Sequence, residues 1–286
     1  SPSLSAFPRE EPPQTPTASP VNLTIPDTTL QGGAVIGTVW RQPAAPEQEA
    51  AQALDTVQLQ NVNLSLPLLH YSSGPNITRA ALLEIASARA FLSDPELELV
   101  QLAGEARMQG DSLVIALRTI QLPSSRLSAE AWLVTRPDDR RFDATAHVEQ
   151  LVMGDVKGFI SSADIPPEWR MSGDLRTTSL RSGSTLIQGR NLDLAVAGGT
   201  VRGQLTLLGQ DNEWTARNSR LDVAGVEVER LLRAFNVPSN LRAQIDGVIT
   251  ADHQAGTADL QIAGAAGYSV RGPVHGHIRA NGNFDA

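Results

Sequence analysis

The chain lacks cysteine, has few aromatic residues and contains no long hydrophobic run. Without cysteine it cannot form disulfides, cysteine-based zinc sites or a catalytic thiolate. Aromatic residues make up 4% of the chain against 41% for all hydrophobic residues, so aliphatic side chains must supply most of its apolar surface. No apolar run approaches the roughly 18–20 residues that cross a bilayer as a helix, so we expect no membrane-spanning helix.

Basic residues are scarce relative to acidic ones. Lys and Arg total 23 against 31 Asp and Glu, which gives a formal net charge of -8 at pH 7. Nucleic-acid binding relies on clustered basic residues that release counterions from the phosphates. The charge balance therefore argues against a nucleic-acid partner.

The composition divides the chain into three sections. Residues 1–20 are rich in Pro, Ser and Thr and are predicted to be a linker, because they offer too little apolar surface to fold. Residues 21–150 form a first strand-rich section, and residues 151–286 form a second one that contains a repeat. The chain starts with Ser1 and still alternates at Ile278, so we expect an internal section of a longer protein.

Apolar and polar residues alternate with a period of two along much of the chain. In RFDATAHVEQ, for example, Phe142, Ala144 and Val148 fall on one face and polar residues fall on the other. Such alternation is typical of strands with one dry and one wet face. Short turns such as QGDS at 109–112 favour antiparallel hairpins over helical crossovers. The predicted fold class is all-β, mainly antiparallel, with one or two short helices.

Three segments depart from simple alternation. Residues 57–69 alternate, slip at Asn61 and resume, which predicts a strand with a bulge. Residues 45–56 combine an early proline with good helix formers and predict a short helix. Residues 77–92 fit a helix by composition and a strand by alternation, and periodicity alone leaves their type open.

Residues 221–250 begin and end as strands but are interrupted in the middle. Apolar residues at helical spacing in VEVERLLRAFN predict a short amphipathic helix. It should end before Pro238, because the residue that precedes a proline is disfavoured in the α conformation. Residues 151–175 follow a similar order and reach Pro166 at the corresponding point. Such a repeat is typical of units that bury their cores by stacking on one another.

No set of residues with catalytic or metal-ligating spacing is recognisable. His275 and His277 share one face of a strand, but a metal site would need a third ligand, so we interpret both as solvent-facing. Asp138 and Asp139 adjoin Pro137 and are typical of a turn. We therefore expect no catalytic residue, no bound metal and no cofactor.

Other residue types with potential chemistry are interpreted as structural. The glycine-rich segments 32–37 and 197–203 do not join a strand to a helix as phosphate-binding loops do, so they are interpreted as turns. Tryptophans are expected to cover sheet edges or fill the core rather than to stack on sugars, namely Trp132, Trp169 and Trp214. The remaining histidines are expected to stand alone and exposed, namely His70, His147 and His253.

Three segments resemble the TamB and AsmA-like family of bacterial envelope proteins. They are VAGVEVERLLRAFNVPSNLRAQIDGVIT, its weaker copy at 151–175, and TADLQIAGAAGYSVRGPVHGHIRANGNF. The resemblance covers roughly Leu151 to the C-terminus and includes no catalytic signature. It implies an elongated, U-shaped β-trough (a β-taco) built from stacked repeats, apolar inside and polar outside.

The resemblance also implies a function and a location. Family members move lipids between the inner and outer membranes and support outer-membrane biogenesis. The parent protein would be periplasmic and anchored in the inner membrane. Lipid acyl chains would be the ligand, and an outer-membrane β-barrel assembly partner would be contacted through regions outside this chain.

The apolar sides of successive alternating runs predict one continuous concave surface that would line the lipid path. Its predicted residues are Leu192, Leu194, Val196, Val201, Leu205, Leu207, Leu221, Val223, Leu241, Ile245, Ile249, Leu260 and Ile262. A closed β-sandwich or barrel, or a β-helix, would instead bury this face. The alternative function is then a structural or adhesive β-scaffold of the cell envelope without a lipid conduit.

Overall fold

The structure is a computed structural model that describes most of the chain. The described residues are 22–25, 27–40, 54–72, 78–93, 96–134, 136, 141–159, 165–180, 183–210, 213–237, 241–253, 255–266 and 274–283. The predicted linker at 1–20 lies outside them, as do the turn residues at 137–140.

Strands dominate these residues and are accompanied by short helices. The strands are β1 (Asn22–Ile25), β2 (Thr28–Trp40), β3 (Leu54–Ser72), β4 (Thr78–Ser93), β5 (Glu96–Gln109), β6 (Ser112–Gln121), β7 (Arg126–Val134), β8 (Phe142–Val152), β9 (Arg170–Ser179), β10 (Thr185–Val196), β11 (Gly199–Gln210), β12 (Glu213–Glu227), β13 (Leu241–His253), β14 (Ala255–Ala266) and β15 (Val274–Asn283). The helices are α1 (Met153–Val156), the 3-10 turn η2 (Lys157–Phe159) and α2 (Val228–Ala234).

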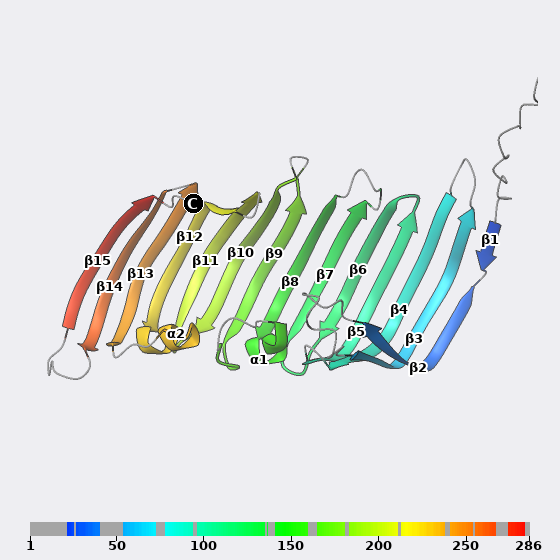
Figure 1. The fold of residues 1–286 in the computed structure, drawn as a ribbon, viewed down its shortest axis with the longest axis horizontal. Helices are drawn as coiled ribbons and strands as arrows, with labels where there is room; N and C mark the ends of the chain where they lie inside the picture. Colours follow the sequence, from blue (N-terminus) through cyan, green and yellow to red (C-terminus); the bar gives the residue numbers. More distant parts are fainter. Residues whose placement is uncertain are drawn as a thin grey trace, which may run out of the picture.

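All fifteen strands belong to one antiparallel sheet. From β3 to β15 each strand pairs with the next one in the sequence, and β1 and β2 pair with different parts of β3. Figure 1 shows the strands side by side in chain order from β15 to β3, with β1 and β2 beside β3 at the far end. The first and last strands do not pair, so the sheet is open. The described residues therefore form neither the closed barrel nor the β-helix that the sequence allowed.

β-Bulges preserve the alternation of apolar and polar faces where the sequence pattern is interrupted by an extra residue. Asn61, Asn191 and Asn218 have φ of 50°, 51° and 45°, and a register shift accompanies each of them. Asparagine tolerates this left-handed conformation better than most residues do. The slip at Asn61 is thus a bulge within β3, as predicted. Each extra residue keeps the apolar side chains before and after it on the same face.

The structure settles the type of one segment in the N-terminal half and corrects the interpretation of another. Residues 78–93 form β4, because pairing with β3 and β5 on both sides outweighs the helical propensity of their Ala and Leu. The glycine-rich segment 32–37, interpreted as a turn, lies inside β2, where Gly32 has φ of 63° next to a register shift. That interpretation was wrong, because glycine serves here as a bulge residue.

The predicted helix at 45–56 falls mostly outside the described residues. Residues 54–56 begin β3, so the helix does not extend to them. The hairpin turn at 109–112 is confirmed, with Gln109 opposite Ser112 and Gly110 at φ of 59°.

Both helices lie at the same end of the sheet, in the connections that follow β8 and β12 (Figure 1). We call this end the helix-bearing rim. Asp155 of α1 accepts hydrogen bonds from the Ser124 N–H at 2.9 Å and the Ser125 hydroxyl at 2.6 Å, which ties the helix to the β6–β7 turn.

The helix predicted before Pro238 is present as α2. It ends because Asn236 takes a left-handed φ of 57°, which lets the Asn236 and Val237 N–H groups bond back to the carbonyls of Arg233 and Leu232. A small hydrophobic cluster fixes the helix to the sheet and contains Trp169, Ala197, Val226 and Ala234.

Candidate functional site

One face of the sheet is apolar along its length, and we call it the apolar face. Residues that are directly opposed in an antiparallel pair lie on the same face, so the register traces this face from strand to strand. One unbroken row of opposed residues crosses nine strands: Leu83, Ala106, Ile115, Ala131, Ala144, Thr177, Ile187, Leu207 and Ala216. A second row crosses β8 to β14: Leu151, Met171, Leu194, Val201, Val223, Gly247 and Leu260.

The apolar face is free of charge over a long distance. Among the described strands, no register position on this face between Ala81 on β4 and Ala251 on β13 is Asp, Glu, Lys or Arg. Charged residues cluster on the opposite face, where Asp193 opposes Arg202 and Asp174 opposes His147. The chain therefore separates a dry face from a wet face over at least ten strands.

The register places all thirteen predicted positions on the apolar face. Leu194, Val201, Val223 and Leu260 belong to the second row, and Leu192, Leu221 and Ile249 lie along the neighbouring row. The other positions continue the same face along their strands: Val196, Leu205, Leu207, Leu241, Ile245 and Ile262. The side chains of Leu241 and Ile262 lie outside the described part of the structure.

Most of these side chains are only half-buried. Leu192 is 8% exposed, whereas Ile249 is 37% exposed. No second layer of described residues covers the face, apart from the cluster at the helix-bearing rim. Half-buried aliphatic side chains on an open sheet form a surface that other apolar groups can contact.

The predicted set omitted the first half of the face. Its positions on β4 to β9 include Leu83, Ile115, Leu133, Val148 and Met171. The alternation of 113–133 already contained this signal, but nothing in it indicated that residues 21–150 and 151–286 share one sheet. Pairing of β8 with β9 joins the two sections without a break.

The wet face is held by cross-strand polar pairs. Arg176 donates two hydrogen bonds to Asp143 on the neighbouring strand, and this contact lowers the pKa of the Asp143 carboxyl below its usual value. The His147 Nδ1 atom lies 2.7 Å from Asp174 Oδ1. The expectation that His147 stands alone was therefore wrong. The contact with His147 is the main cause that lowers the pKa of the Asp174 carboxyl below its usual value, and a hydrogen bond from the Asn191 side chain contributes to the same shift.

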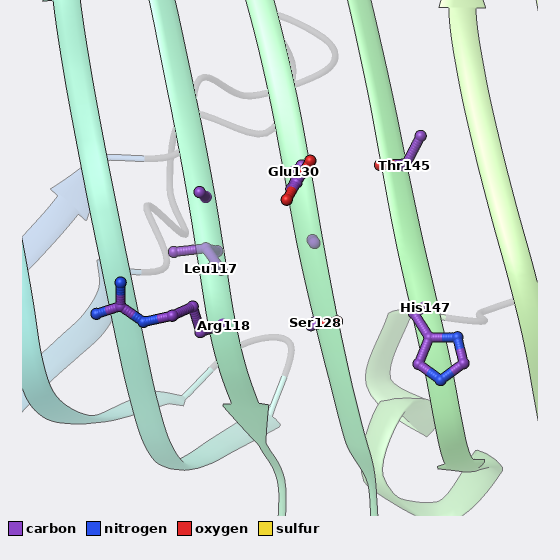
Figure 2. A pocket seen from close by; sticks show the side chains of 8 residues that line it. Leu117, Arg118, Ser128, Glu130, Thr145 and His147 are labelled. Atoms are coloured by element: carbon purple, nitrogen blue, oxygen red, sulfur yellow. The ribbon is translucent and has the colours of Figure 1, made fainter.

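A shallow depression of about 440 Å³ crosses the wet face at β6 to β8. Figure 2 shows Arg118, Glu130 and His147 on three neighbouring strands, with the Arg118 side chain directed away from the histidine. The polar groups do not converge on one point, so we do not take this depression as the principal site.

The other residues singled out by the sequence have structural surroundings where they are described. Trp169 is buried in the rim cluster, and Trp214 lies against Gly209 on the apolar face. Trp132 is on the wet face, 6.0 Å from the Arg141 guanidinium. The side chains of His275 and His277 lie outside the description, as do Asp138 and Asp139.

The described residues contain neither a candidate metal-binding cluster nor a helix able to span a membrane. No group of three or more His, Cys, Asp or Glu is arranged to hold a metal ion there. The helices in the same part of the chain are all too short or too polar to cross a bilayer.

Comparisons with protein-family models, curated proteins and solved structures give no match to this chain.

Proposed function

We propose that the apolar face carries the acyl chains of lipids and that the chain is a section of a protein that moves lipids between the inner and outer membranes. The observation that carries this proposal is a charge-free aliphatic face that crosses at least ten strands and that no second layer of described residues covers. An enclosed core would need a second layer that covers this face, whereas a lipid path needs a continuous apolar surface that stays open.

The energetics of acyl chains fit such a surface. Each methylene removed from water contributes about 0.8 kcal/mol, and Leu, Ile, Val and Ala present no polar group that would need a partner. An acyl chain can therefore slide between equivalent positions, because no single contact dominates. The wet face keeps the opposite side of the sheet hydrated through its charged pairs.

The finer architecture is part of the proposal. The sheet is proposed to curve about the apolar face into a U-shaped trough, the β-taco that the resemblance to TamB and AsmA-like proteins implies. The four strands between one rim helix and the next would be the repeating unit. The α1 and α2 connections at the same rim support that unit.

The location and wider role follow from the same resemblance. The parent protein is proposed to be periplasmic, anchored in the inner membrane, and to support outer-membrane biogenesis. A β-barrel assembly partner of the outer membrane would bind regions outside this chain.

Site-specific crosslinking tests the lipid proposal. A photoreactive residue at Leu194 or Ile245 should crosslink to phospholipid in cells, because both positions lie on the apolar face. The neighbouring positions Asp193 and Gln244 are matched controls on the wet face. Equal lipid labelling from both faces, or labelling by protein alone, would favour a structural scaffold without a conduit.

A further inference from the structure

We propose that a cavity at the helix-bearing rim binds the phosphate group of a phospholipid whose acyl chains lie on the apolar face. The inference rests on the lipid function proposed above and adds a headgroup site to it. The cavity has a volume of about 630 Å³ and surrounds the turn that joins β10 to β11. Helix α2 forms one side of it and residues 166–170 form the other.

Three of the residues that line this cavity are arginines. Its lining includes Arg170 at the start of β9, and Arg230 and Arg233 on α2. Among the described residues that line it, Glu168 is the single acidic one. Arginines from two different elements thus line one cavity, and several guanidinium groups within reach of one space can recognise a phosphate through charge-assisted hydrogen bonds.

The three arginines retain donors for a ligand. Arg230 uses its Nε to reach Glu227 at 2.8 Å, and Arg233 uses Nη2 to reach Glu229 at 2.7 Å. A guanidinium has five N–H groups, so each of these pairs leaves others available while holding the side chain in place.

Arg170 differs from the other two. No residue in the described part of the chain forms a hydrogen bond or ion pair with its guanidinium, although it is exposed at the cavity wall. Arg170 is therefore the arginine whose charge the structure leaves uncompensated, and it is the first one to test.

The cavity adjoins the apolar face. Val196, which ends β10 on that face, lines it together with Trp169 and Ala234 of the rim cluster. The register places Arg170 on the wet side of the rim, opposite Ala195, so a phosphate held by the arginines lies at the edge of the sheet, where the apolar face begins. An anion at that edge suits a lipid headgroup whose acyl chains continue over the apolar face. From Val196 the 12 residues of β10 run about 40 Å across the sheet, long enough for an acyl chain to lie along it.

The test compares two lipids that share acyl chains and differ in the phosphate. The purified chain is loaded from vesicles that contain phosphatidylglycerol and diacylglycerol, and the bound lipids are quantified by mass spectrometry. Wild type should prefer phosphatidylglycerol. Arg170→Gln should lower the phosphatidylglycerol-to-diacylglycerol ratio about tenfold, because one charge-assisted contact is lost, and should leave diacylglycerol loading unchanged.

Arg126→Gln is the matched control. Arg126 is also an exposed arginine at this rim, where it lies 3.7 Å from Glu149, but it does not line the cavity. The phosphatidylglycerol-to-diacylglycerol ratio of this control variant should stay at the wild-type value. An equal drop for both variants would mean that general surface charge attracts the lipid, and would overturn the site.

The remaining outcomes separate this inference from the lipid function itself. An unchanged ratio in Arg170→Gln, with lipid still bound, would overturn the headgroup site and leave the lipid function standing. A wild type that loads neither lipid would overturn both. Titration with inorganic phosphate tests whether the cavity binds a free anion instead. If Arg170→Gln weakens phosphate binding but leaves the lipid ratio unchanged, the cavity is a site for a free anion and not for a lipid headgroup.

Discussion

Leu194 lies directly opposite Val201 in the pairing of β10 with β11. One residue before Leu194, Asp193 accepts a hydrogen bond of 2.9 Å from Arg202 on the same neighbouring strand. A step of one residue thus changes an aliphatic contact into an ion pair, because successive side chains of a strand point to opposite faces. The proposed function depends on this strict separation, and adjacent positions offer matched tests of it.

A carboxylate on the apolar face should block lipid binding. Ile245→Asp places an unpaired charge among aliphatic positions, where removing it from water costs several kcal/mol, so an acyl chain can no longer cover that position. We expect the bound lipid in purified protein to fall about tenfold or more, as measured by mass spectrometry. Leu194→Asp should have the same effect.

The control for this prediction lies on the same strand. Gln244→Glu adds the same charge on the wet face, where it remains hydrated, and should leave the lipid load unchanged. Circular dichroism of each variant establishes that the sheet has formed. Equal lipid loss in Ile245→Asp and Gln244→Glu, or no loss in either, would show that the apolar face is not a lipid path.

The Asp143–Arg176 pair should make stability depend on pH. Because contact with Arg176 lowers the pKa of Asp143 in the folded protein, the pair stabilises the fold above the unfolded pKa near 3.9. That contribution is lost as pH falls through the folded pKa. Asp143→Asn should therefore lower the free energy of unfolding by about 0.5–1 kcal/mol at pH 7 and by less near pH 2, where part of the pair's contribution is lost.

Urea unfolding at the two pH values measures this difference. Glu149→Gln is the comparison variant, because the Glu149 carboxylate is 3.7 Å from Arg126 and both side chains are more than half exposed. It should change stability little at either pH. A penalty for Asp143→Asn that is the same at pH 7 and pH 2 would contradict an ionic origin.

Much of the fold could be predicted because it follows from local patterns. Alternation identified the strands and their apolar sides, the slip at Asn61 identified a bulge, and the proline at 238 marked the end of a helix. Residues 78–93 remained ambiguous because Ala and Leu suit a helix by propensity, and their pairing with β3 and β5 is a long-range property.

The features that sequence reasoning missed depend on contacts between distant residues. The alternation could not reveal whether another layer covers the apolar face, since an open sheet and a closed sandwich have the same pattern. The rim cavity joins Arg170 to Arg230 and Arg233 through the packing of α2 on the β10–β11 turn. No local spacing indicates that arrangement, and the same holds for the contact between His147 and Asp174.

Close approach of neighbouring strands should make Gly203 irreplaceable. It has φ of 147°, and a Cβ there would lie 2.0 Å from the Arg220 carbonyl oxygen of the adjacent strand. Gly110 also has a positive φ, 59°, but its Cβ would meet nothing within 4 Å. We expect Gly203→Ala to destabilise the protein by at least about 2 kcal/mol more than Gly110→Ala, as measured by urea unfolding. Equal penalties would mean that backbone conformation alone, rather than strand contact, sets the cost.

Trp169 should be the side chain that holds the helix-bearing rim together. It is 8% exposed and packs with Ala197, Val226 and Ala234, whereas Trp214 is 53% exposed and mainly covers Gly209. Trp169→Ala should therefore cost about 3–5 kcal/mol of unfolding free energy, and Trp214→Ala only about 1–2 kcal/mol. Hydrogen exchange adds a local readout, because amides of α2 should lose protection in Trp169→Ala while amides of β3 and β4, far from the cluster along the sheet, keep theirs. Similar unfolding penalties for the two tryptophans, with α2 still protected, would show that the rim helix is held by its connections to β12 and β13 and not by the hydrophobic cluster.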